Sequence, residues 1–162
     1  MASHGTTRLA EQSTRGDLPL GDQCPIDRTL QVIGNRAALL LLRETFFGAT
    51  RFNQLRKGAG IAPAVAAQRL HQLVAAGVLE KQPYREPGQR TRSEYVLTPA
   101  GHGLMPIVLA LIQWGSAHAP KSCGAEMTHA GCGAGVRAVA YCAAGHVVDE
   151  SGVVFAVGGT AR

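Results

Sequence analysis

The side chains with the greatest capacity for chemistry are four cysteines and six histidines. Near the C-terminus, four of them follow the spacing His-x2-Cys-x9-Cys-x3-His, at His129, Cys132, Cys142 and His146. Imidazole nitrogens and thiolate sulfurs are the usual ligands of tetrahedral zinc, and two loops could bring these four together. A strong zinc motif would have two C-x-x-C pairs, but Gly145 stands where a second cysteine would follow Cys142. A zinc site and a metal-free β appendage therefore both stay open for this segment.

Cys24 is a second reactive candidate, because it stands immediately before Pro25. Proline is favoured in the first turn of a helix, where its missing N–H would have no partner anyway. The positive end of the helix dipole favours a thiolate, and hence reaction with oxidants and electrophiles. Asp22 and Asp27 lie close by and oppose that effect. A redox sensor and a small buried apolar residue are both compatible with this position.

Motifs for catalysis and for membrane insertion are missing from the sequence. It contains no paired carboxylates, phosphate-binding loop or nucleophile motif, so we expect no enzyme. Apolar runs such as residues 37–42 and 107–112 are six residues long, which is too short for a transmembrane helix. Residues 1–23 contain no apolar block of the kind found in signal peptides. We therefore expect a cytoplasmic protein with reduced cysteines and no membrane partner.

The positive charge is confined to the middle of the sequence. Residues 24–119 contain eleven lysines and arginines and five acidic residues, a net charge of +6, whereas residues 1–23 sum to −1 and residues 120–162 to zero. A concentrated positive field predicts a polyanionic partner for the middle segment. An ordinary solvated basic surface is the alternative, and charge alone does not decide between them.

Apolar periodicity and helix-capping residues predict five helices in this basic segment. They cover residues 25–33, 36–46, 51–56, 63–76 and 99–119. The second helix is apolar nearly all round, so it should lie at the centre of the domain. The third and fourth are short and are joined by a turn that contains Gly58 and Gly60. Two such helices form a helix-turn-helix pattern.

Strand-like segments at residues 78–84 and 93–97 flank a loop of proline, glycine and three arginines, which predicts a β-hairpin with a basic tip. Near the C-terminus, a strand at residues 137–142 should precede a hairpin that pairs residues 146–148 with 153–155.

Three parts are expected along the chain. They are a disordered arm at residues 1–23, a folded domain at residues 24–119, and a small β appendage containing cysteine and histidine at residues 120–162.

The order of elements in the folded domain is that of a winged helix-turn-helix. The residues that carry a further resemblance are Cys24-Pro25, Leu30, Ile33-Gly34, Leu39–Glu44, Arg51–Leu55, Ile61, Arg69-Leu70, Leu73, Gly77 and Glu94–Gly101. Over residues 24–116 they resemble the HxlR-type family of MarR-like bacterial transcriptional regulators. The resemblance implies a mainly α (α+β) fold, with a β-hairpin wing and a long terminal dimerisation helix, here followed by the small β appendage.

In that family the domain is a homodimer that binds DNA, and its terminal helices form the dimer interface. Some members use a cysteine that matches Cys24 as a redox sensor. The sequence departs from the family pattern at Ala37, where tryptophan is usual, and at Ala62, where serine often caps the next helix. The helix at residues 63–76 is also unusually rich in alanine.

The resemblance implies that the N-terminal half of the helix at 63–76 enters the major groove of DNA. Its outward face should consist of Ala64, Ala67, Gln68 and His71. Gln68 can form two hydrogen bonds with adenine, and alanine methyls can contact thymine methyls. The alternative for Gln68 and His71 is that they are solvated surface residues.

Phosphate contacts should come from basic residues around this helix. The candidates are Arg51, Arg69, Arg85, Arg90 and Arg92. The last three flank the hairpin loop and could also reach the minor groove. Such contacts supply affinity more than sequence specificity.

The sequence therefore predicts a sequence-specific transcriptional regulator that binds double-stranded DNA as a symmetric homodimer and represses by steric blocking. A small-molecule or oxidant effector is left open. Two other classes are considered: a protein-interaction module that reuses the winged fold without specific DNA binding, and an enzyme with cysteine and histidine chemistry in the C-terminal segment. Salt-dependent affinity for the chain's own promoter DNA would separate the first class from the other two.

Overall fold

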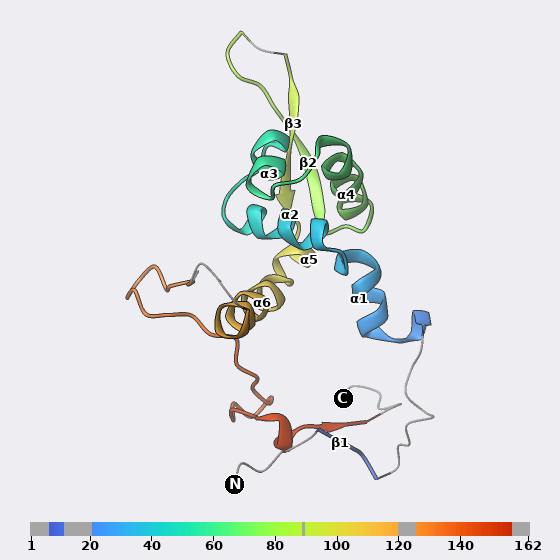
Figure 1. Cartoon of the computed structure of the whole chain (residues 1–162), viewed down its shortest axis with the longest axis vertical. Coiled ribbons are helices and arrows are strands. Elements are labelled where there is room, and N and C mark those ends of the chain that lie inside the picture. The colour runs from blue at the N-terminus through green and yellow to red at the C-terminus, as the bar shows by residue number, and fades with distance from the viewer. Residues whose placement is uncertain (1–6, 12–20, 89, 120–125, 157–162) are drawn as a thin grey trace. The chain divides into compact units, whose positions relative to one another are not determined.

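The computed structural model describes residues 7–11, 21–88, 90–119 and 126–156 (Figure 1). The chain separates into two compact units: residues 29–137, and residues 1–28 together with 138–162. These boundaries differ from the three expected segments, since the two ends of the chain belong to one unit. The larger unit contains the hairpin and the helices from residue 36 onwards, and the boundary between the units falls within the first helix.

The first two helices begin and end where the sequence predicts. Helix α1 covers Pro25–Ile33 and helix α2 covers Arg36–Phe46. Asn35 caps α2, because its side-chain oxygen accepts the N–H of Ala38 at 2.9 Å. Helix α2 packs against three other helices and strand β3, so its predicted central position is confirmed. Among the apolar residues of α1, Ile33 is buried, whereas Leu30 is 55% exposed.

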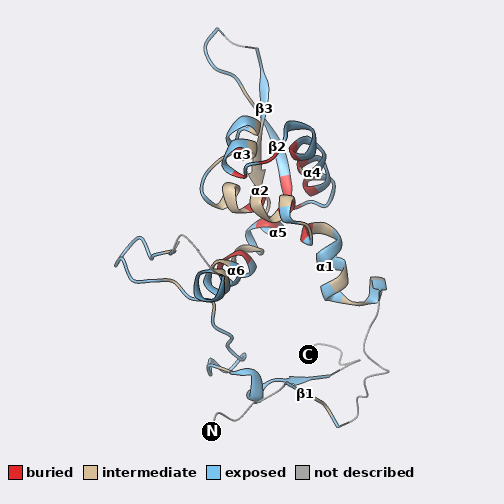
Figure 2. Cartoon of the chain, viewed as in Figure 1, coloured by how far each residue is buried: buried red, intermediate tan, exposed pale blue. Residues whose placement is uncertain are grey.

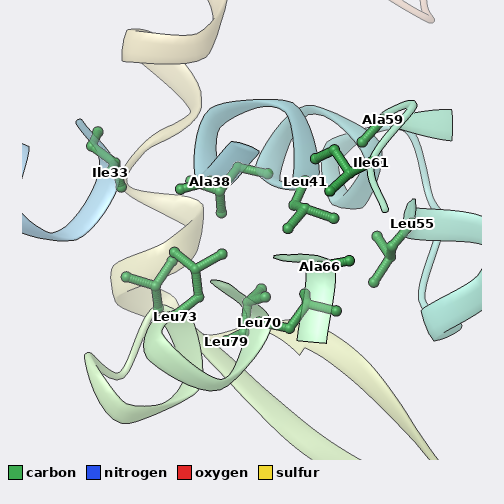
Figure 3. Packing of buried hydrophobic residues seen from close by; sticks show 12 residues of the cluster. Ile33, Ala38, Leu41, Leu55, Ala59, Ile61, Ala66, Leu70, Leu73 and Leu79 are labelled. Carbon is green, nitrogen blue, oxygen red and sulfur yellow. The ribbon is translucent and has the colours of Figure 1, made fainter. Parts of the chain in front are cut away.

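Helices α3 (Phe52–Gly58) and α4 (Pro63–Ala75) form the helix-turn-helix. The turn between them contains Gly60 at φ +64°, a conformation that glycine adopts without strain. Leu55 of α3 and Leu70 and Leu73 of α4 are buried against α2 (Figures 2 and 3). This apolar cluster fixes the orientation of α4 and leaves its opposite face exposed.

The hairpin forms as predicted from strands β2 (Leu79–Tyr84) and β3 (Arg92–Leu97), paired antiparallel from Leu79 opposite Leu97 to Tyr84 opposite Arg92. Leu79 is buried in the core beside α4, which anchors the base of the hairpin. Tyr95 lies on the same core, and its partial burial raises the pKa of the phenol.

The predicted single helix at 99–119 is two helices, α5 (Pro99–His102) and α6 (Met105–His118). Pro106 lies in the first turn of α6, and because proline has no N–H and crowds the preceding turn, a continuous helix cannot pass through it. In α6, Val108 and Leu109 are buried, whereas Leu111 is 49% exposed. Among the described residues, no helix has the length and apolarity needed to cross a bilayer.

Helix α5 lies very close to Val78, the residue that precedes β2. Thr98 caps α5 by accepting the Gly101 N–H at 3.1 Å, and the Thr98 N–H donates to the Val78 carbonyl at 3.1 Å. Gly101 is buried, and a Cβ placed on it would lie 2.2 Å from the Val78 carbonyl oxygen. Only glycine therefore fits at this junction.

The second unit differs from the sequence prediction. Strand β1 (Arg8–Leu9), in the arm expected to be disordered, pairs in parallel with β4 (Val154–Phe155). The rest of the described arm is the short 3₁₀ helix η2 (Gly21–Gln23), while residues 1–6 and 12–20 lie outside the described residues.

The predicted pairing of residues 146–148 with 153–155 is wrong. Tyr141 instead forms a β-bridge with Val147. The segment after Val148 turns into the 3₁₀ helix η3 (Glu150–Gly152), which Asp149 caps. Donation to the Asp149 carboxylate by the Ser151 hydroxyl and the Gly152 N–H lowers its pKa. This cap replaces the tight turn that a hairpin needs.

The start of α4 offers a test of stability. The N-cap residue, Ala62, provides no side-chain acceptor. Replacing Ala62 by serine should raise the free energy of unfolding by about 0.5–2 kcal/mol, because the hydroxyl can accept a free N–H of the first turn. Urea unfolding at constant protein concentration measures the change. Ala75→Ser, at the other end of α4, is the control, and an equal gain in both variants would contradict the capping argument.

Candidate nucleic-acid interface

The outward face of α4 is the centre of the candidate site. Ala66, Leu70 and Leu73 point into the core and are buried. The residues predicted to face outwards are all exposed: Ala64, Ala67, Gln68 and His71. The sequence analysis did not include Val65, whose side chain is 41% exposed on the same helix. The helical period places Val65 on the flank of α4, between the buried side formed by Ala66, Leu70 and Leu73 and the outward-facing Gln68, so periodicity alone does not assign it to the exposed face.

Arg69 borders the exposed face and is half-buried. Its Nη1 donates to the side-chain oxygen of Gln72 at 2.6 Å. Its Nε is buried and has no hydrogen-bond partner among the described residues. The guanidinium is thus held against the helix surface, beside Leu70. The phosphate contact expected of Arg69 stays a prediction.

Two strands carry the basic tip of the hairpin, called the wing from here on (residues 85–92). Arg85, Arg90 and Arg92 are exposed in it. Gly88 has φ +73°, so the tip uses a conformation that glycine adopts without strain. Figure 1 shows the hairpin extending beyond the helices of the larger unit, which gives these arginines access to a ligand bound at α4.

Arg51 has protein partners that the sequence analysis did not anticipate. Its Nη2 lies 2.7 Å from Glu86 Oε1, and its guanidinium carbon lies 4.7 Å from the centre of the Tyr84 ring. The salt bridge is about half-exposed, so it contributes little stability by itself. Its geometric effect is clear, since it joins the start of α3 to the wing. A phosphate contact from Arg51 stays a prediction, and it would have to compete with Glu86.

Backbone and side-chain hydrogen bonds reinforce this junction. The Tyr95 N–H donates to the Thr50 carbonyl at 2.8 Å, and the Thr50 hydroxyl donates to Glu94 Oε2 at 2.8 Å. Arg51 also forms a β-bridge with Glu94. The short segment before α3 therefore acts as a third strand beside β3, and it holds the wing in a defined direction relative to α4.

The four predicted zinc ligands lie in two separate turns of the chain, one in each unit. In the larger unit, His129 Nδ1 is 3.3 Å from Cys132 Sγ; in the smaller unit, Cys142 Sγ is 3.6 Å from His146 Nδ1. Two such ligands of one tetrahedral zinc ion would be about 3.5 Å apart, given bonds of about 2.0 and 2.3 Å. Each pair therefore fits half of a zinc site.

The described residues do not bring together a complete set of metal ligands. Among the described residues, no group of three or more histidine, cysteine, aspartate or glutamate side chains could hold a metal ion. Cys123 lies outside the described residues. Zinc binding by this segment stays a prediction.

Cys24 lies at the start of α1, as predicted. Its carbonyl accepts the Arg28 N–H at 3.0 Å, which places it in the N-cap position. The thiol is free and half-buried, so it is neither fully shielded nor fully open to solvent. Asp27, in the first turn of α1, keeps a negative charge nearby.

Helices packed around α2, an exposed second helix of the helix-turn-helix and a basic hairpin define a winged helix-turn-helix protein. More specifically, the chain belongs to the HxlR-like helix-turn-helix family, whose model matches residues 32–123.

Similar proteins come from several bacteria. A helix-turn-helix transcriptional regulator of Mycobacterium bovis, Mb3122, is 38% identical over 110 residues, which cover 67% of this chain and 68% of that protein. YybR of Bacillus subtilis, also named a transcriptional regulator, is 32% identical over 62% of this chain and 79% of its own length.

Solved structures show the same fold. PA1607, a proposed transcription factor, is 33% identical with a TM-score of 0.70, over 79% of this chain and 90% of that one. The redox regulator HypR in its oxidised form is 33% identical with a TM-score of 0.52, over 58% and 96% of the two chains.

The wing arginines can be tested by the salt dependence of DNA binding. Replacing Arg90 and Arg92 by alanine should flatten the plot of log affinity against log salt by about one to two units per half-site, because each neutralised phosphate contributes about 0.9. A gel-shift series across salt concentrations measures the slope. Arg137→Ala removes a charge outside the wing and serves as the control. An unchanged slope in the wing variant would exclude the wing from the interface.

Proposed function

We propose that this chain represses transcription by binding a near-palindromic operator as a homodimer. By its family the chain is a DNA-binding transcriptional regulator. The observation that carries the proposal is the exposed face of α4 beside a wing with three exposed arginines. In this arrangement α4 reads bases in the major groove and the wing binds phosphates. Repression follows from occupancy, since a compact regulator on a promoter blocks access to it.

The homodimer is supported by exposed apolar residues, most of them on α6. Ile107, Leu111 and Trp114 of α6 are 39%, 49% and 64% exposed, and Leu30 of α1 is 55% exposed. Beside them lies a groove of about 230 Å³ lined by Leu39, Leu40, Arg43, Val108, Leu111 and Ile112. Apolar side chains in such a group favour burial against a protein surface. A second copy of the chain is the occupant that a twofold operator requires.

The remaining features of the proposal follow from DNA binding. The partner is chromosomal double-stranded DNA, so the protein acts in the cytoplasm and needs no membrane. Half-sites should be about one helical turn apart, as in other symmetric helix-turn-helix dimers. We assign the chain no enzymatic activity, and we do not favour a protein-interaction module, because the family to which the chain belongs consists of regulators.

The dimer and the operator can be tested together. Wild-type protein should sediment as a dimer and should protect a twofold-symmetric site in genome-wide footprinting. Leu111→Asp should sediment as a monomer and lose most of the protection, because a charge in the apolar interface must be desolvated. Val139→Asp, at an exposed valine in the other unit, should leave both properties unchanged. Absence of salt-dependent binding to any promoter fragment would refute the proposed function.

Redox control through Cys24 is a second proposal, favoured by the half-buried free thiol at the start of α1 and by the similarity to HypR. A thiolate attacks one oxygen of hydrogen peroxide, forming a sulfenic acid and releasing hydroxide, which takes up a proton to become water. The polar product would disturb the start of α1. Because exposed Leu30 lies on this helix, the change would reach the proposed dimer surface.

Titration with hydrogen peroxide separates a sensor from a structural cysteine. Operator affinity of the wild-type protein should change with peroxide, whereas Cys24→Ser should not respond. Cys142→Ser, which removes an exposed thiol from the C-terminal segment, is the matched control and should respond like the wild type. An identical response of wild type and Cys24→Ser would dismiss Cys24 as the sensor.

A further inference from the structure

The first turn of α4 presents a wholly apolar surface. Ala62, Pro63, Ala64 and Val65 are all exposed. Val65 is the largest of them, and it does not belong to the hydrophobic core. The first exposed side chain of α4 that can form hydrogen bonds is Gln68, one helical turn later. Most side-chain contacts that distinguish bases in the major groove are hydrogen bonds, so this composition restricts what the first turn can recognise.

The only apolar group that a base pair exposes in the major groove is the C5-methyl of thymine. The edges of adenine, guanine and cytosine present hydrogen-bond donors or acceptors there. Covering one of these with a valine side chain removes its water without supplying a partner, which is unfavourable. A thymine methyl, in contrast, gains from contact with apolar side chains. The apolar first turn therefore discriminates among the four bases although it forms no hydrogen bonds with them.

The position of Gln68 adds a second constraint. It follows Val65 by three residues, which corresponds to about 4.5 Å along the helix axis. This spacing is close to the rise of about 3.4 Å from one base pair to the next. Gln68 can form two hydrogen bonds with adenine, because adenine exposes a donor and an acceptor side by side in the major groove. Val65 and Gln68 would then face neighbouring A·T pairs.

We infer that Val65, supported by Ala64, recognises the methyl group of a thymine in each operator half-site, next to an adenine that Gln68 binds. The inference rests on the proposed function and specifies its DNA sequence preference. Phosphate contacts by the wing are independent of it, so overall affinity and thymine recognition can be lost separately.

Deoxyuridine provides the test, because it differs from thymidine only by the missing methyl. The operator is first selected from random duplexes with wild-type protein, and each thymine of a half-site is then replaced by deoxyuridine in turn. At one position per half-site the replacement should weaken wild-type binding about fourfold, the effect of losing one buried methyl. Val65→Ala should bind both duplexes nearly equally and retain the wild-type salt slope. Val139→Ala, the same change at an exposed valine of the other unit, should behave as wild type.

The outcomes distinguish the two proposals. Failure of the wild-type protein to bind any duplex in a salt-dependent way refutes the proposed function. Specific binding that no deoxyuridine weakens overturns the thymine inference alone. The inference is also overturned if Val65→Ala discriminates between the two duplexes as strongly as wild type, since another group would then recognise the methyl.

Discussion

The structure depends on burial of a small group of leucines around α2. Six leucine side chains are almost completely removed from water: Leu41, Leu42, Leu55, Leu70, Leu73 and Leu79. Each contributes about 1.5–3 kcal/mol relative to an exposed side chain. They come from α2, α3, α4 and β2, so the same burial that stabilises the fold also sets the directions of the helix-turn-helix and the hairpin. No buried polar or charged residue is present among the described residues.

Polar contacts orient the wing relative to this apolar core. The wing is a long hairpin, and an isolated hairpin is only marginally stable in water. Here Thr50 and Arg51 hold it from the side, through Tyr95 and Glu94 and through the ion pair with Glu86. Arg51 therefore occupies the junction of the two surfaces that would contact DNA. The sequence pattern indicated only a phosphate contact for Arg51. Its positioning role was hidden because the partner, Glu86, lies in a loop dominated by arginines.

Local signals were sufficient to predict most of the larger unit. Helices α1 to α4 and the hairpin follow from apolar periodicity, glycines at turns and prolines at helix starts, which act over a few residues. The break before Pro106 was also encoded locally, but a strong apolar pattern on both sides concealed it. The exposure of Leu30 and Leu111 does not follow from periodicity, which identifies an apolar face without telling what covers it.

Contacts between distant parts of the sequence were the least predictable. The pairing of Arg8–Leu9 with Val154–Phe155 involves two residues on each side, too few to leave a periodic signal. The same limit applies to the candidate site. Outward-facing residues of α4 followed from the helical period, whereas the partners of Arg51 depend on how the hairpin folds back. The two cysteine–histidine turns formed locally, as their short spacing suggested.

Gly101 has a mechanical consequence. With no room for a Cβ between α5 and the Val78 carbonyl, the backbone of α5 lies directly against the chain that connects α4 to β2. At this contact backbone meets backbone, with the Leu97 side chain beside it. A rotation of α5 and α6 would therefore tilt the helix-turn-helix and the hairpin with them, because this contact transmits movement rigidly.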